Sequence, residues 1–165
     1  DSFRDAAALR ELCRERDVLF VVNDSVDIAV AVDAPAVHVG QHDLPVEAVR
    51  RIVPMTTIVG VSCHSFEDVE RALGDGADYI AVGSVYPTSQ KESAVVVGLE
   101  LVRRARQRIG NTPLVAIGGI DRSTIGDVIA AGADAVAVVS AVAGQEDVAG
   151  AARELCTAMG AGKGQ

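Results

Sequence analysis

Acidic and amide side chains stand directly after the first two apolar runs of the chain. Asn23 and Asp24 follow the first run, and Asp43 lies shortly after the second. Carboxylate oxygens from two different strands suit Mg²⁺, which keeps several waters and bridges to substrate phosphates. A simpler interpretation is that each aspartate caps the helix after it, near Ser25 and at Pro45. At this point the pattern leaves both interpretations open.

Glycines and hydroxyl groups near the end of the chain could bind a phosphate. Gly118 and Gly119 end an apolar run, and their turn can bring backbone N–H groups close to an anion. A helix expected to open at Ser123 would add partial positive charge. Ser140 ends the next run, as in the phosphate sites that barrel enzymes build after their last two strands. Alone, a Gly-Gly pair is more often only a tight turn.

The longest stretch between apolar runs, residues 84–98, carries hydroxyl, amide and ammonium groups. Thr88, Ser89 and Gln90 precede Lys91, so this loop could wrap around an anion with Lys91 as a point charge. An exposed polar loop would have the same composition. A long loop inside a compact domain is usually functional, however.

Histidine and serine occur together near the middle of the chain. Ser62 and His64 are two residues apart on an expected strand, so their side chains face the same side. A Ser–His pair without an acid partner is weak evidence for hydrolysis. His38 lies inside an apolar run, and we interpret it as a core or barrel-lining residue with satisfied hydrogen bonds.

Short apolar runs alternate with amphipathic stretches along the whole chain. The runs predict strands at 18–23, 36–40, 58–62, 79–83, 114–118 and 135–140. The stretches predict helices at 3–16, 46–52, 65–73, 99–109, 123–131 and 148–159. The tripeptide Gly-Ala-Asp occurs at 76–78 and again 56 residues later, at 132–134. We therefore expect an α/β fold of the (β/α)8 TIM-barrel type, with six of its eight units forming one incomplete domain over residues 1–165.

The composition excludes several classes of protein. The 165 residues include 15 Lys and Arg against 23 Asp and Glu, and the net charge of −8 disfavours nucleic acid or an anionic membrane as a partner. Aromatic residues make up only 3%, which predicts an aliphatic core. Three scattered cysteines without a C-x-x-C motif indicate neither a zinc site nor a disulfide framework, so we expect a cytoplasmic protein.

Several segments together resemble the thiamin phosphate synthase family, in that family's order. They are residues 22–27, 37–45, 60–65, 76–80, 85–88, Lys91, 97–100, 116–120 and Ser140. The motifs are specific jointly rather than singly, and they cover nearly the whole chain. The resemblance implies a transferase that joins hydroxymethylpyrimidine diphosphate to a thiazole phosphate and releases pyrophosphate.

The resemblance also implies the roles of individual residues. Asp24 and Asp43 would ligate Mg²⁺, and Asn23, Ser62 and Lys91 would hold the pyrimidine diphosphate. The thiazole phosphate would be held, partly through backbone N–H groups, by Thr88, Ser89, Gln90, Gly119, Val139 and Ser140. In the family's dissociative mechanism the bond to pyrophosphate breaks first, so no protein nucleophile or strong base is expected.

The sequence departs from the family's pattern in three places. Gln90 replaces the second hydroxyl of a Thr-x-Thr loop, and Ser84 stands where proline is common. The family's first two strands and first helix, with a basic segment that helps to bind the diphosphate, have no counterpart. We therefore expect either a fragment of a longer polypeptide or a homo-oligomer that covers its strand edges.

Two alternatives come from different functional classes. A thiazole tautomerase of the same superfamily would use His64 as its acid and base, although Asp43 argues for a metal that such an enzyme does not need. A non-catalytic remnant would bind phosphate or a partner without turnover. A more distant sugar-phosphate barrel enzyme would share the Gly118-Gly119 turn but not the two aspartates.

Overall fold

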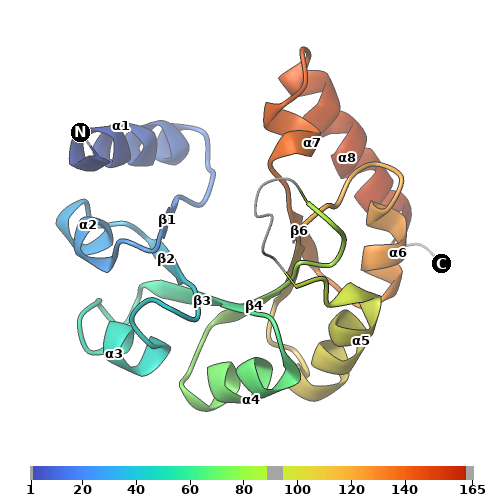
Figure 1. Cartoon of the computed structure of the whole chain (residues 1–165). Helices are drawn as coiled ribbons and strands as arrows, with labels where there is room; N and C mark the ends of the chain where they lie inside the picture. Colours follow the sequence, from blue (N-terminus) through green and yellow to red (C-terminus); the bar gives the residue numbers. More distant parts are fainter. Residues whose placement is uncertain (1, 89–94, 163–165) are drawn as a thin grey trace. The chain divides into compact units, whose positions relative to one another are not determined.

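The computed structural model describes residues 2–88 and 95–162, in which strands alternate with helices (Figure 1). The strands are β1 (Val21–Asn23), β2 (Ala36–Val39), β3 (Ile58–Cys63), β4 (Tyr79–Val82), β5 (Leu114–Ile117) and β6 (Ala135–Ala137). The helices are α1 (Ser2–Glu15), α2 (Val26–Ala31), α3 (Val46–Arg50), α4 (Phe66–Gly74), α5 (Gly98–Ile109), α6 (Ile125–Ala130), α7 (Ser140–Ala143) and α8 (Val148–Gly162). The predicted binding residues Ser89, Gln90 and Lys91 lie outside the described residues.

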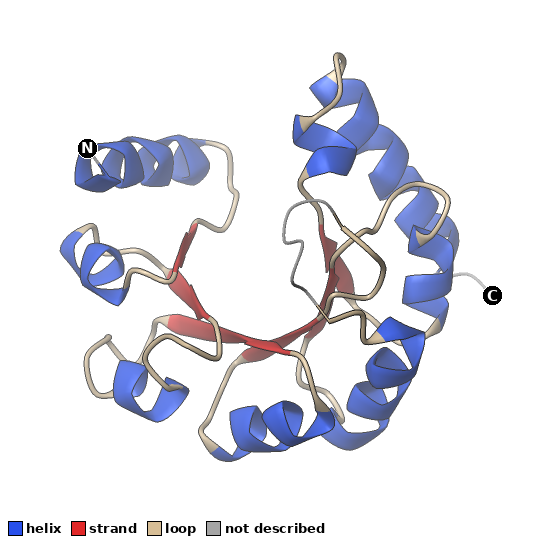
Figure 2. Cartoon of the chain, in the orientation of Figure 1, coloured by secondary structure: helices blue, strands red, loops and turns tan. Residues whose placement is uncertain are grey.

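The strands follow one another in the sheet in their order along the chain, from β1 to β6. The pairs β1–β2, β2–β3 and β5–β6 are parallel. A helix between successive strands carries the chain back, so the next strand can run in the same direction (Figure 2). The predicted alternation of buried strands with helices is thereby confirmed.

Some elements differ in extent from the prediction. The first strand begins at Val21 rather than at residue 18, and Val18 is 57% exposed. The reason is the register, because Val21 pairs with Ala36, the first residue of β2. The last strand ends at Ala137, opposite the last residue of β5, so Ser140 begins α7 instead of ending a strand.

The contacts of the chain group it into two compact units. The first runs to Ser62 and includes Glu70–Ile80, and the second comprises Cys63–Val69 and the chain from Ala81 onward. A single domain over residues 1–165 stays a prediction. Among the described residues, every buried apolar side chain except Cys63 is Ala, Val, Leu or Ile, as the composition predicts. No described helix has both the length and the apolar character needed to cross a membrane.

An arginine–aspartate lock fastens the loop before β4 in the first unit. Arg50 of α3 donates to the carboxylate of Asp78 and to the carbonyls of Thr57 and Gly76. The same Asp78 Oδ2 accepts the backbone N–H of Val59 at 2.7 Å. One carboxylate therefore joins a helix, a loop and a strand through charge-assisted hydrogen bonds.

The second unit repeats this lock before β6. Arg106 of α5 lies 2.7 Å from Asp134 Oδ2 and donates to the carbonyls of Gly110 and Thr112. Asp134 Oδ2 also accepts the N–H of Leu114 at 2.8 Å. The two arginines are 56 residues apart, the same spacing as the Gly-Ala-Asp repeat. The repeat in the sequence is therefore the acidic half of a repeated structural lock.

Asp78→Ala tests the contribution of the first lock to stability. The change removes the bonds to Arg50 and to the Val59 N–H, so we expect the free energy of unfolding to fall by about 2 kcal/mol. Urea unfolding followed by circular dichroism measures this loss. Glu146→Ala, which removes an exposed carboxylate, is the matched control. Equal midpoints for both variants would contradict a stabilising role for the lock.

Candidate functional site

Strand pairing in the first unit places Asn23, His38 and Gly60 at one level. Asn23 pairs with His38, and His38 pairs with Gly60. Residues paired across parallel strands point to the same face of the sheet. The next residue, Asp24, adopts a left-handed backbone with φ of 65° and donates its N–H to the His38 carbonyl at 2.8 Å. Asn23 and Asp24 are both exposed just where β1 ends, so both can meet a ligand.

Asp43 turns back toward the end of β2. Its Oδ2 accepts the backbone N–H of Gly40 at 2.7 Å, and the residue is exposed. The helices that follow the two aspartates have Ser25 and Pro45 as N-caps, and neither cap makes a side-chain capping bond. The N-cap positions are therefore Ser25 and Pro45, and the printed bond of Asp43 runs back to Gly40 rather than forward into α3.

The donors of the predicted cation site are the hard oxygens that Mg²⁺ prefers. No cluster of three or more His, Cys, Asp or Glu able to hold a metal ion occurs in residues 2–88 and 95–162. Mg²⁺ does not need such a cluster, because one or two carboxylates with waters and substrate phosphates complete its shell. The exposed carboxylates of Asp24 and Asp43 fit this donor set.

A hydrogen-bonded chain of three side chains lies beside these residues. His38 Nδ1 is 2.8 Å from the Tyr79 hydroxyl, and His38 Nε2 is 2.8 Å from Ser62 Oγ. This confirms the interpretation of His38 as a residue with satisfied hydrogen bonds. Burial lowers the pKa of His38, an effect that the nearby Asp43 carboxylate partly opposes. Burial also raises the pKa of Tyr79 to about 12.

A glycine makes room for this chain of side chains. Gly60 lies on β3, and a Cβ there would overlap the ring of Tyr79. Without a side chain at this position, the Tyr79 and His38 rings stack with centroids 5.5 Å apart and planes 29° from parallel. The sequence reasoning did not identify Tyr79, although it is one of only two tyrosines in a chain poor in aromatic residues.

Ser62 is also held through its backbone. Gln41 Nε2 donates to the Ser62 carbonyl at 2.7 Å, and Arg71 Nη1 donates to Gln41 Oε1 at 3.1 Å. The hydroxyl of Ser62 is thus oriented by His38 while its carbonyl is fixed by Gln41. Among the predicted diphosphate-binding residues that the structure describes, Ser62 is the one set in such a network.

In the second unit, the loop after β4 packs directly on the Gly118-Gly119 turn. The backbone N–H of Tyr86 donates to the Gly118 carbonyl at 3.0 Å. A Cβ on Gly118 would overlap Ser84, and one on Gly119 would overlap the Pro87 carbonyl. Both glycines have positive φ, 98° and 65°. The turn therefore needs glycine for its backbone and for the close approach of this loop.

The predicted thiazole phosphate residues in this unit lie at the ends of elements. Thr88 is half-buried in the loop after β4, and Gly119 is exposed just after β5. Val139 and Ser140 are exposed at the start of α7. The helix expected to open at Ser123 begins at Ile125 instead.

An aspartate occupies the turn before that helix. Asp121 Oδ1 accepts the N–H of Ser123 at 2.8 Å and that of Thr124 at 3.2 Å. The hydrogen bond from the Ser123 hydroxyl lowers the pKa of Asp121, and the bonds from these backbone N–H groups lower it further. A protein carboxylate therefore already occupies the N–H groups just before this helix, whose partial positive charge was expected to favour a phosphate.

His64 is tied to the backbone of its own unit. Its Nδ1 donates to the Gly83 carbonyl, and its N–H donates to Asp68 Oδ2 at 3.0 Å. Ser65 and Asp68 bond to each other reciprocally, each side chain accepting the other's N–H at 3.1 Å, and this pair caps α4.

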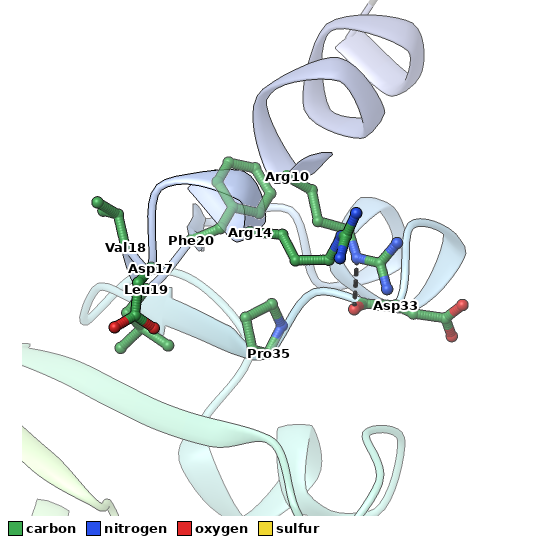
Figure 3. Close-up of a pocket in the computed structure, with 8 residues that line it drawn as sticks. All are labelled: Arg10, Arg14, Asp17, Val18, Leu19, Phe20, Asp33 and Pro35. Carbon is green, nitrogen blue, oxygen red and sulfur yellow. Dashed lines mark hydrogen bonds between the residues drawn. The ribbon is translucent and has the colours of Figure 1, made fainter. Parts of the chain in front are cut away.

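Two cavities lie at the other end of the strands in the first unit. The larger, of about 500 Å³, is lined by residues that precede β1 and β2, among them Arg10, Arg14 and Phe20 (Figure 3). Arg10 Nε donates there to the Asp33 carbonyl at 3.1 Å. The smaller, of about 400 Å³, borders the residues before β3. Neither contains a predicted site residue, and barrel enzymes bind substrates at the carboxyl ends of strands.

Known proteins are similar in sequence to this chain over most of its length. The family model described as thiamine monophosphate synthase matches residues 1–142. The thiamine-phosphate synthase of Methanocella arvoryzae is 48% identical over 153 residues, which are 92% of this chain and 72% of that protein. The thiamine-phosphate synthase of Chloroflexus aurantiacus is 47% identical and covers 92% of this chain and 69% of its own length.

Solved structures agree with these relatives. The thiamine phosphate pyrophosphorylase from Pyrococcus furiosus superposes with a TM-score of 0.91 at 42% identity, over 98% of this chain and 77% of its own. This confirms the predicted TIM-barrel type of fold with six βα units. The 3-hexulose-6-phosphate synthase from Salmonella typhimurium, at 17% identity and a TM-score of 0.74, shares the fold alone. From the family match and the close relatives, the chain belongs to the thiamine monophosphate synthase family.

Proposed function

We propose that this protein is a thiamine-phosphate synthase. It is a transferase that joins hydroxymethylpyrimidine diphosphate to a thiazole phosphate, forming thiamin phosphate and releasing pyrophosphate. The observation that carries this proposal is the family match over residues 1–142, with relatives of that name at 47–48% identity. The exposed Asn23 and Asp24 at the end of β1, with Asp43 after β2, support a diphosphate site.

Asp24 and Asp43 are the residues that would hold Mg²⁺. When bound, this cation offsets the negative charge that builds up on the departing pyrophosphate. Asn23 and Ser62 bind the diphosphate as hydrogen-bond donors, and Lys91 supplies a point charge. The Gly40 N–H orients the Asp43 carboxylate, so this side chain does not need to reorganise when substrate arrives.

The thiazole phosphate is assigned to the second unit. Gly119, Val139 and Ser140 offer backbone N–H groups and a hydroxyl, and Thr88, Ser89 and Gln90 are assigned to the same anion. The close packing of Pro87 against Gly119 supports this assignment, because it fixes the backbone just before Thr88. No side chain has to act as a nucleophile. The protein's contribution is the alignment of two substrates.

Partners and compartment follow from the same proposal. The substrates are small phosphorylated molecules, and the net charge of −8 disfavours nucleic acid or an anionic membrane. We place the protein in the cytoplasm. Association with a second copy stays a prediction.

Asp24→Asn and Asp43→Asn test the two proposed cation ligands. Each change keeps the side-chain size but removes a charge, so we expect kcat/KM for pyrophosphate release to fall about 100-fold or more. The assay contains both substrates and saturating Mg²⁺. Asp27→Asn, at an exposed position in the first turn of α2, is the control and should keep wild-type rates. Wild-type rates in the two ligand variants would refute the assignment.

Chelation distinguishes the synthase from the alternatives. We expect EDTA to abolish pyrophosphate release, because without Mg²⁺ the negative charge on the leaving pyrophosphate is no longer offset. Excess Mg²⁺ should restore the activity. Turnover of the thiazole substrate that survives the chelator would favour the tautomerase. Calorimetric binding of thiamin phosphate without any turnover would favour the non-catalytic remnant.

A further inference from the structure

His38 touches Asp24 and Ser62, two of the residues assigned to the diphosphate site. Its carbonyl accepts the N–H of Asp24, and its ring Nε2 contacts Ser62 Oγ. We propose that His38 is a positioning residue whose Nε2–H donates to Ser62 Oγ, so that the Ser62 hydroxyl proton points to an oxygen of the substrate diphosphate. This inference rests on the proposed function, in which Ser62 binds that substrate.

The direction of the hydrogen bonds follows from the chemistry of the three groups. A neutral imidazole has one N–H, so one ring nitrogen donates and the other accepts. If Tyr79 donates to Nδ1, then Nε2–H donates to Ser62 and the Ser62 O–H is left for the substrate. In the reverse order, the Ser62 hydroxyl donates its hydrogen bond to Nε2. Only its oxygen lone pairs would then face the substrate anion. Only the first order suits a diphosphate oxygen.

Tyr79 supports the first order. Its pKa of about 12 keeps the hydroxyl protonated at physiological pH, so it remains a donor. Within the described residues, His38 Nδ1 is the hydrogen-bond partner of this hydroxyl. The reverse order would make the half-buried oxygen an acceptor and leave its proton to seek another partner.

The fold holds all three side chains in place. Tyr79 reaches His38 across β3 because Gly60 has no side chain, and the two rings stack. His38 is in register with Asn23 and Gly60, and Gln41 fixes the Ser62 carbonyl. A ring locked at both nitrogens cannot turn, so the Ser62 hydroxyl is oriented before the substrate binds, which lowers the entropic cost of binding.

Tyr79→Phe is the sharpest test, since it removes one hydroxyl and keeps the ring that packs over Gly60. We expect the KM for pyrimidine diphosphate to rise about tenfold, as the tautomer lock on His38 is lost, while the KM for thiazole phosphate stays unchanged. A purely structural defect would alter both. Equal effects on both substrates, or no effect on either, would overturn the proposal.

A double-mutant cycle shows whether the effect passes through Ser62. In a Ser62→Ala background, Tyr79→Phe should cause no further loss, because the hydroxyl to be oriented is gone. Additive losses would refute the relay. His38→Gln, whose amide can still donate to Ser62, should bind pyrimidine diphosphate better than His38→Leu at similar thermal stability. Equal affinities of the two variants would also refute it.

A spectroscopic readout keeps this inference separate from the proposed function. In the ¹⁵N-histidine-labelled protein without substrate, we expect His38 to carry its proton on Nε2, and Tyr79→Phe to increase the Nδ1–H form. A dominant Nδ1–H form in the unchanged protein would overturn the proposed direction, whatever the enzyme assay shows. If the expected tautomer is observed but the enzyme releases no pyrophosphate, the result would contradict the synthase assignment and leave the proposed hydrogen-bond direction intact.

Discussion

Parallel pairing of β1, β2 and β3 in one register is the constraint on which the first unit's site depends. Asn23, His38 and Gly60 are level because their backbones are bonded in that register. A slip of one residue in β2 would turn His38 to the opposite face of the sheet and separate it from Ser62 and Tyr79. The N–H of Asp24 extends the same ladder by one bond, so its position also follows from the pairing.

Glycines, which have no side chain, matter as much as the polar residues in this protein. Gly60 leaves the space in which the Tyr79 and His38 rings stack, and Gly119 leaves the space into which the Pro87 carbonyl packs. In the first unit a glycine thus lets Tyr79 reach His38, and in the second unit Gly119, itself a predicted binding residue, lets the loop after β4 pack against it. The polar residues of the site can be held rigidly only because these close approaches are possible.

The sequence predicts the fold well because buried parallel strands appear as short apolar runs. The ends of these runs can be recognised from the sequence alone. The positions of Asn23, Asp24 and Ser62 near strand ends could be predicted for the same reason. Tyr79 could not, because its contact with His38 crosses an intervening strand and depends on Gly60. The Asp121 turn was also missed, since nothing local shows that its carboxylate, rather than a ligand, binds the following N–H groups.

The repeated arginine–aspartate lock affects how pieces of such proteins can be exchanged. Arg50 lies on the helix after β2 but grips the loop before β4, and Arg106 does the same between α5 and β6. Each lock therefore spans one complete strand and its following helix. A chimaera assembled from two relatives with a crossover inside either interval would separate the arginine from the aspartate that pairs with it. Crossovers just after Asp78 or Asp134 would leave the preceding lock within one parent.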